Sequence, residues 1–269
     1  MSNDRLDLVA RSTGTGWKEE LSSGRFSGMS ILITGAGSGI GLATALRIAR
    51  EGGHVIAVDR VAERLASLID LAQGLSIVPV AADITTNEGI AAITAATGGH
   101  LDGLVNNAGI ADGFTPLGET SDELWDRVMS INVTAPFKLT RALLPQLEQS
   151  HAASVVNIAS IGGLRAAVAG TAYVTSKHAI IGMTRSASFF YRDTSIRFNA
   201  VAPGAVMTNL ELSFESKLGQ ERIGDYLAAV PPPPAEAEQI AASVTFLLSR
   251  DATNINGAVL SSDNGWSAM

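Results

Sequence analysis

Short apolar runs rich in β-branched residues recur along the chain and alternate with longer stretches of helical periodicity. Most runs are apolar at every position, which is typical of strands buried on both faces of a parallel sheet. Helical patterns, such as residues 40–53 and 237–250, separate the runs. We therefore expect strands at residues 30–34, 54–58, 76–82, 103–107, 154–159, 196–202 and 257–262.

This alternation predicts the α/β class: a single Rossmann-like, doubly wound parallel sheet of about seven strands with helices on both faces. Residues 1–28 precede the first strand and are polar and rich in Gly and Ser, so we expect a loosely ordered N-terminal extension. Residues 29–269 are expected to form one catalytic domain. Within it, residues 208–234 include the run Pro231–Pro234, which cannot continue a helix. We expect this insert to be a substrate-binding lid.

Composition narrows the function classes. The chain has 269 residues, of which 46% are hydrophobic, enough for one large core. A formal net charge of −7 gives no electrostatic footprint for nucleic acid, and no apolar run is long enough to span a membrane. Cysteine is absent and the four histidines have no ligand spacing, so we expect no metal site. No secretory signal pattern is present, which favours a cytoplasmic protein, although the lack of cysteine fits an extracellular one nearly as well.

A glycine-rich turn joins the first strand to the first helix. Its pattern is T-G-x-x-x-G-x-G and not G-x-G-x-x-G, because Ile40 stands where the last glycine would be. Such a turn lets backbone N–H groups approach a pyrophosphate at a helix N-terminus. A turn that needs glycine for its geometry alone is the alternative. The glycines are Gly35, Gly37, Gly39 and Gly41.

Asp59 ends the second strand, 59 − 35 = 24 residues after the first glycine. About twenty is the usual spacing for an acid that binds a ribose, and a carboxylate there repels a 2′-phosphate. Ser38, where a basic residue would suit NADP, also favours NAD. Arg60 is a contrary sign because it could reach a phosphate, and Asp59 could instead be a helix cap or turn residue.

Tyr173 precedes Lys177 by four residues, which places both on one face of a helix. A nearby cation favours the phenolate and so lowers the pKa of a tyrosine from about 10. Chance alone produces such pairs on many helices. Ser160 ends a strand thirteen residues earlier, where α/β sheets bind ligands. Asn132 lies in another helical stretch, where an amide is modestly unfavourable. It therefore either has a buried role or is simply an exposed residue.

Taken together, these motifs resemble the short-chain dehydrogenase/reductase family. They are TGAGSGIG, NNAG at 106–109, IN at 131–132, NIAS ending at Ser160, YVTSK, and NAVAPGAVMT at 199–208. The order and spacing agree with the family from residue 30 to residue 266. The linked set is specific, whereas each motif alone is not.

The resemblance implies a role for each matched residue. Tyr173 is the general acid/base, Lys177 lowers its pKa and binds the nicotinamide ribose, and Ser160 orients the substrate oxygen. Asn132 holds a water in a proton relay to Lys177. The remaining cofactor residues implied by the resemblance are Gly35, Ser38, Gly39, Ile40 and Gly41 at the pyrophosphate, Asp83 and Ile84 at the adenine, Asn107 at the adenosine ribose, and Val206 and Thr208 at the carboxamide. Asp59 and Arg60 complete the expected cofactor residues on the grounds given above.

The expected function is an NAD-dependent oxidoreductase that transfers hydride reversibly between the cofactor and a secondary alcohol or ketone, with NADP less favoured. An NADPH-dependent 3-oxoacyl thioester reductase and a non-catalytic dinucleotide sensor are the alternatives. The resemblance also implies a homotetramer. Secondary alcohols, steroids, sugars and 3-oxoacyl thioesters all remain open as substrates.

Three segments are expected to form the substrate pocket: residues 110–119, 161–170 and 209–226. Arg165 is the cation between Ser160 and Tyr173. It either pairs with a substrate carboxylate or phosphate or, as is commoner for charged residues, lies solvated in an exposed loop.

Overall fold

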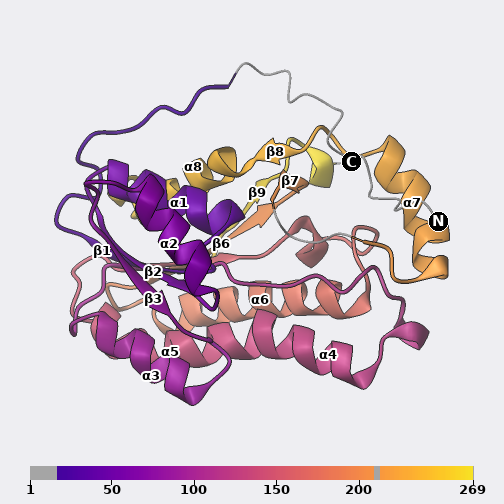
Figure 1. Cartoon of the computed structure of the whole chain (residues 1–269), viewed down its shortest axis with the longest axis horizontal. Coiled ribbons are helices and arrows are strands. Elements are labelled where there is room, and N and C mark those ends of the chain that lie inside the picture. Colours follow the sequence, from indigo (N-terminus) through magenta and orange to yellow (C-terminus); the bar gives the residue numbers. More distant parts are fainter. Residues whose placement is uncertain (1–16, 209–212, 269) are drawn as a thin grey trace.

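A seven-stranded parallel sheet forms the centre of the computed structural model, which describes residues 17–208 and 213–268 (Figure 1). The strand order is β3-β2-β1-β4-β5-β6-β9, so the winding reverses between β1 and β4. This confirms the predicted fold class. The strands are β1 (Ser30–Thr34), β2 (His54–Asp59), β3 (Ile77–Ala81), β4 (Gly103–Asn106), β5 (Ser154–Ile158), β6 (Arg197–Pro203) and β9 (Val259–Ser262).

Helices cover both faces of the sheet (Figure 1). One face packs against α1 (Gly39–Arg50), α2 (Ala62–Leu71) and α8 (Ala237–Leu248). The other face packs against α3 (Asn87–Ala96) and α5 (Ala135–Leu147), with α4 (Asp122–Met129) and α6 (Thr171–Phe190) in the same layer. The two helical layers explain why the strands are apolar throughout and do not alternate.

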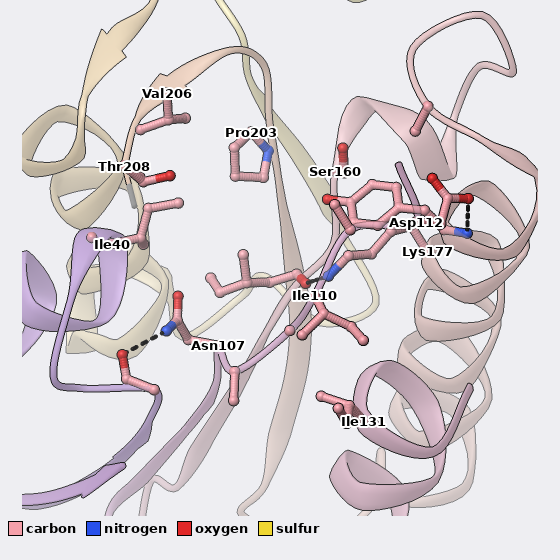
Figure 2. Close-up of a pocket in the computed structure, with 18 of the residues that line it drawn as sticks. Ile40, Asn107, Ile110, Asp112, Ile131, Ser160, Lys177, Pro203, Val206 and Thr208 are labelled. Carbon is pink, nitrogen blue, oxygen red and sulfur yellow. Dashed lines mark hydrogen bonds between the residues drawn. The ribbon is translucent and has the colours of Figure 1, made fainter. Parts of the chain in front are cut away.

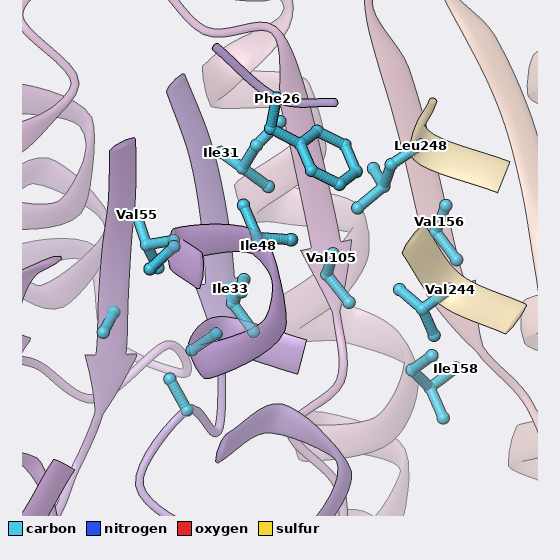
Figure 3. Packing of buried hydrophobic residues seen from close by; sticks show 14 of the residues in the cluster. Phe26, Ile31, Ile33, Ile48, Val55, Val105, Val156, Ile158, Val244 and Leu248 are labelled. Atoms are coloured by element: carbon cyan, nitrogen blue, oxygen red, sulfur yellow. The ribbon is translucent and has the colours of Figure 1, made fainter. Parts of the chain in front are cut away.

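Strand β1 shows how the sequence builds this core. Ile31 and Ile33 point toward α1 and α8, whereas Leu32 points toward α5, and all three are fully buried. Ile48 of α1 and Val244 of α8 fill the space above the sheet (Figure 3). Successive side chains of a strand point to opposite faces, so a strand between two helical layers needs apolar residues at every position.

The N-terminal segment departs from the expected loosely ordered extension. Residues 17–28 pack against the domain: Phe26 is fully buried in the same core as Ile48 (Figure 3), and Glu19 forms an ion pair of 3.1 Å with Arg47 of α1. One aromatic anchor and an ion pair hold this polar segment in place, which its composition does not indicate. The expectation for residues 1–16 lies outside the described residues.

The insert after β6 contains elements that periodicity did not predict. Two short strands, β7 (Val206–Met207) and β8 (Ala235–Glu236), pair in parallel and form a second sheet. Between them, α7 (Lys217–Ala229) lies apart from the two helical layers, at the right of Figure 1. Residues 209–212 lie outside the described residues.

Candidate active site

A cavity of about 790 Å³ opens at the carboxyl ends of the strands, where the winding of the sheet reverses (Figure 2). Ligands of doubly wound sheets bind at this position. Gly41 and Asn132 lie behind its wall. The predicted site residues that line it are Gly35, Ser38, Gly39, Ile40, Asp59, Arg60, Asp83, Ile84, Asn107, Ser160, Tyr173, Lys177, Val206 and Thr208.

The glycine turn is tightly packed against β1. A Cβ on Gly41 would lie 2.2 Å from the carbonyl oxygen of Gly35, so α1 can approach β1 only with glycine at this position. The Nδ2 group of Asn107 donates to the carbonyl oxygens of Thr34 (2.9 Å) and Gly35 (3.2 Å). The Asn107 amide nitrogen therefore fixes the glycine turn by two hydrogen bonds, a role that the sequence does not indicate.

Asp59 connects the second strand to the same turn. Its Oδ2 accepts a hydrogen bond from the Gly37 N–H (3.0 Å) and its Oδ1 accepts one from Val61 (3.0 Å). The carboxylate is 6% exposed and lines the cavity. Arg60 and Arg64 also line the cavity, and Arg64 was not predicted.

The start of α1 provides the donors that a pyrophosphate needs. Ser38 is the N-cap residue, yet its side chain caps no helix N–H, so the first-turn amides are not capped by this hydroxyl. Gly39 has φ +52°, a conformation that favours glycine. Ile40 lies on the same side of the cavity as Val206 and Thr208 (Figure 2). The glycine cradle and helix N-terminus fit a dinucleotide pyrophosphate.

Asp83 and Ile84 follow β3 at the Asp59 end of the cavity. The Asp83 carboxylate accepts hydrogen bonds from the Thr85 N–H (2.8 Å) and hydroxyl (2.6 Å), and these bonds lower the pKa of Asp83. Ile84 is 8% exposed and presents an apolar surface beside it. A flat base could lie on such a surface, as the resemblance implies.

Ser160 and Lys177 lie close to each other at the cavity (Figure 2), and Tyr173 lines the cavity beside them. The Ser160 hydroxyl lies close enough to the Tyr173 phenol to lower the pKa of the tyrosine. The Lys177 ammonium lies 5.5 Å from the centre of the tyrosine ring and donates to the Ile158 carbonyl oxygen at 2.9 Å. The last residue of β5 therefore holds the lysine of α6, and the serine that follows β5 faces the phenol.

Burial governs the ionisation of this group. Burial raises the pKa of Tyr173, while the Ser160 hydroxyl opposes the rise and the charge of Asp112 adds to it. Burial also lowers the pKa of Lys177 from 10.5 to about 8. The expected lowering of the tyrosine pKa by Lys177 does not outweigh desolvation in the protein alone.

Asn132 lies in a π-helical turn, Ser130–Thr134, where a regular helix was expected. It is 2% exposed: its Oδ1 accepts from the Ile110 N–H (2.9 Å), and its Nδ2 donates to the Ile110 carbonyl (3.0 Å) and the Ser176 hydroxyl (3.1 Å). This amide therefore ties the loop after β4 to α6. Single π turns occur mostly at functional sites.

An apolar cluster forms the substrate side of the cavity. Trp266, near the C-terminus, was not predicted to belong there. The ring of Phe114 packs against that of Phe214 in the insert, with centroids 4.4 Å apart. All three pocket segments expected from the sequence contribute cavity residues. The fully or largely buried members of the cluster are Phe114, Ile161, Leu227 and Trp266.

Arg165 follows neither of its two expected roles. It is not among the residues that line the cavity, and its guanidinium donates to the carbonyl oxygen of Ser267. Within residues 17–208 and 213–268, no group of acidic or histidine side chains could hold a metal ion. No helix in the same part of the chain is long and apolar enough to cross a membrane.

Comparison with known proteins shows the family of the chain. The short chain dehydrogenase family model matches residues 29–218. The chain is 36% identical over 249 residues to "Short-chain dehydrogenase/reductase cdmF" of Talaromyces verruculosus (89% of this chain, 97% of the relative). It is 36% identical over 250 residues to "3beta-hydroxysteroid dehydrogenase 2" of Eggerthella lenta (90% and 96%).

The fold agrees as well. The crystal structure of levodione reductase superposes with a TM-score of 0.81 at 34% sequence identity, covering 91% of this chain and 99% of that one. A family model over most of the chain, relatives of similar length and a shared fold lead to one conclusion. The chain belongs to the short-chain dehydrogenase family of nicotinamide-dependent oxidoreductases.

Proposed function

We propose that this protein is an NAD-dependent dehydrogenase that interconverts a neutral, largely apolar secondary alcohol and its ketone. The observation that carries the proposal is the meeting of Tyr173, Ser160 and Lys177 in one cavity beside the glycine turn. A non-catalytic dinucleotide sensor needs no phenol between a serine hydroxyl and a buried ammonium.

Each residue contributes one part of the chemistry. The bound nicotinamide accepts or gives the hydride. In alcohol oxidation, the Tyr173 phenolate takes the hydroxyl proton as the C–H bond breaks; in ketone reduction, the phenol returns that proton. Ser160 donates a hydrogen bond to the same substrate oxygen and fixes it beside the phenol. One proton and one hydride are transferred in each direction of the reaction.

Lys177 and Asn132 support the proton transfer. With its pKa near 8, the Lys177 ammonium exchanges its proton within the physiological range, and its charge favours the phenolate once substrate and cofactor exclude water. Asn132 lies near Lys177. A Cβ built on Gly109 would be 3.3 Å from Asn132 Oδ1 and 3.6 Å from Lys177 Nζ, so both groups lie next to the same point. This placement supports the proposed proton relay from Lys177 past Asn132.

We infer a preference for NAD over NADP from Asp59. Its carboxylate is fixed by two backbone N–H groups and lines the cavity beyond the glycine turn. A ribose diol can donate to it, whereas a 2′-phosphate would be repelled. Arg60 and Arg64 reduce that repulsion, so we expect NADP to bind more weakly than NAD but not to be excluded.

The cavity wall supports a neutral substrate. Phe114, Leu227 and Trp266 offer apolar surface, and Glu215 adds a negative charge beside Gly113, since a Cβ on Gly113 would lie 2.7 Å from the Glu215 side chain. An acyl thioester on an anionic carrier would approach this acid unfavourably. This argues against the 3-oxoacyl thioester reductase and for alicyclic alcohols, the class named in the hydroxysteroid relative.

A substrate panel tests the proposal. Purified protein is assayed at 340 nm with NAD and with NADP on cyclohexanol and a 3β-hydroxysteroid, and in reverse on acetoacetyl-coenzyme A. We expect turnover of at least one alicyclic alcohol and at least tenfold higher kcat/KM with NAD, by analogy with the value of one well-placed charge interaction. Preference for acetoacetyl-coenzyme A with NADPH would favour the alternative.

Three further features belong to the proposal. The insert 208–234 acts as a lid, supported by the Phe114–Phe214 contact and by the Glu215 N–H bond to the Gly113 carbonyl oxygen (2.9 Å). Residues 29–269 form the catalytic domain, against which residues 17–28 pack. The proposed location is the cytoplasm, as expected from the sequence.

Assembly into a homotetramer is supported by exposed aromatic side chains on α5 and α6. Phe137 is 47% exposed, Phe189 60% and Phe190 76%. The rings of Phe189 and Phe190 lie 5.5 Å apart, and clustered exposed aromatic residues are typical of protein interfaces. Light scattering after size exclusion tests this: a tetramer has four times the 27.9 kDa mass of the chain.

A further inference from the structure

Asp112 is a buried carboxylate that the proposed mechanism does not use. It is 2% exposed and lies in the loop that follows β4. Its Oδ1 accepts hydrogen bonds from the N–H groups of Gly170 (3.0 Å) and Phe114 (3.2 Å), and its Oδ2 accepts one from the Tyr173 N–H (2.9 Å) (Figure 2). Burying a charge is costly, and three donors on one carboxylate offset that cost.

Two of these donors belong to the start of α6, the helix that carries Tyr173. Gly170 is the N-cap residue and has no side chain to cap the helix. Asp112 supplies that cap from another element, because it accepts the third N–H of the first turn, that of Tyr173 itself. The negative charge also stabilises a helix N-terminus. A Cβ on Gly170 would lie 2.5 Å from Asp112 Oδ2, so glycine is required for this approach.

The third donor belongs to a strained turn in the substrate wall. Gly113 has φ +63° and Phe114 has φ +58°, a conformation that bulky residues rarely adopt. Phe114 is 4% exposed, lines the cavity and packs against Phe214. The bond from its N–H to Asp112 stabilises this turn. Strained backbone of this kind persists where the surroundings hold it, most often at functional sites.

We propose that Asp112 is a positioning residue, whose carboxylate joins the Phe114 turn to the start of α6 and so sets the Tyr173 phenol opposite Ser160 and the substrate. The inference rests on the proposed function, because it assigns Tyr173 the proton transfer. No motif that carries the family resemblance includes Asp112, which follows NNAG and one further pair of residues.

The charge of Asp112 has a second consequence. The groups that face the Tyr173 side chain are the Ser160 hydroxyl, the Lys177 ammonium and the Asp112 carboxylate. Asp112 raises the pKa of Tyr173, so its neutralisation moves that pKa downward. A neutral cap would not have this effect, so the pH profile reports the charge of Asp112 while kcat reports how it positions the phenol.

The test compares wild-type protein with Asp112→Asn, which keeps the shape but removes the charge and one acceptor. For the best alcohol of the substrate panel, we expect kcat to fall roughly 10- to 100-fold, as for a small misplacement of a catalytic group. The affinity for NAD, measured by fluorescence quenching, stays unchanged. The rising limb of kcat/KM against pH in alcohol oxidation moves to lower pH.

Asp102→Asn is the matched control. Asp102 is also a buried carboxylate that accepts a backbone N–H, from Ser30 at 2.8 Å, but it precedes β4 and does not line the cavity. This variant should lose stability and keep both kcat and the pH profile. If Asp112→Asn behaves like Asp102→Asn, or keeps wild-type kcat and pH profile, the inference is wrong.

A second readout needs no substrate. The chain has three tyrosines, so ζ-¹³C-tyrosine NMR with Tyr173→Phe for assignment follows the Tyr173 pKa in the NAD complex. A lower pKa in Asp112→Asn supports the inference, and an unchanged pKa contradicts it. Wild-type protein that transfers no hydride to any panel compound would contradict the proposed function instead, while this titration still decides the inference.

Discussion

At the scale of single residues, the site is governed by burial as much as by charge. Sequence spacing places Tyr173 and Lys177 on one helical face, and the structure brings Ser160 to the same place. Spacing does not predict that desolvation raises the tyrosine pKa and lowers that of Lys177 to about 8. Such shifts depend on which atoms surround the group, and these come from the loop after β4, from β5 and from the segment that follows β5.

Lys177 gives a prediction for stability against pH. Its pKa falls from 10.5 in the unfolded chain to about 8 in the fold, so between these values the unfolded state binds more protons. The free energy of unfolding contributed by Lys177 therefore rises with pH from about 8 toward 10, by up to about 3 kcal/mol.

Urea denaturation at pH 7.5 and pH 9.5 measures this term as the difference between wild type and Lys177→Met. The difference should shift in favour of wild type at the higher pH, as the folded ammonium loses its proton. A difference that does not change between the two pH values would show that the lysine is not desolvated.

Asp59 gives a prediction for cofactor choice. In Asp59→Asn the amide keeps the size of the side chain but no longer repels a 2′-phosphate, and Arg60 and Arg64 remain beside it. We expect the affinity for NADP to rise roughly tenfold relative to the affinity for NAD, as for loss of one charged interaction. Isothermal titration with both cofactors checks this. An unchanged ratio would place the ribose elsewhere.

At the scale of elements, glycines set how closely α1 approaches β1. A Cβ at Gly41 would meet the Gly35 carbonyl oxygen at 2.2 Å, whereas a Cβ at Gly182, exposed on α6, would meet nothing within 4 Å. Gly41→Ala is therefore expected to displace the glycine turn and weaken NAD binding at least tenfold. Gly182→Ala, its control, should keep NAD affinity and gain roughly 0.5–1 kcal/mol of stability, because alanine favours a helix.

Calorimetry of NAD binding and thermal denaturation compare the two variants. Equal NAD affinity in Gly41→Ala and wild type would mean that the turn does not hold the pyrophosphate.

The elements themselves show where sequence reasoning ends. Continuous apolar runs predict the inner strands β1, β2, β4, β5 and β6 because these lie between helical layers, whereas the edge strand β3 is partly exposed. The π turn at Asn132 and the β7–β8 pair escape prediction, since both depend on tertiary hydrogen bonds and not on local periodicity. The same holds for Asp112, which belongs to an expected pocket segment but whose three N–H partners come partly from a helix sixty residues away.

At the scale of the whole molecule, the N-terminal segment is part of the fold. Phe26 is fully buried among Ile31, Ile48 and Leu248 (Figure 3), and Glu19 pairs with Arg47 at the end of α1. Composition alone pointed to a loose extension, because one buried aromatic residue carries little weight in a polar segment.

Phe26→Ala should therefore lower the free energy of unfolding by about 3–5 kcal/mol, the usual cost of removing a buried phenylalanine. Chemical denaturation measures it. Leu21→Ala, at a residue that is 45% exposed in the same segment, is the control and should change stability by less than about 1 kcal/mol. Equal effects of the two variants would mean that the segment does not pack on the domain in solution.

The fold places a glycine-rich dinucleotide site and the side chains of Tyr173, Ser160 and Lys177 around one cavity. The central claim is that Tyr173 transfers the proton in hydride exchange. Its most direct test is Tyr173→Phe, which keeps the ring and removes the phenolic oxygen. We expect kcat to fall by about 10²–10⁴-fold or more, with an unchanged dissociation constant for NAD. Retention of wild-type kcat on the same alcohol would contradict the account.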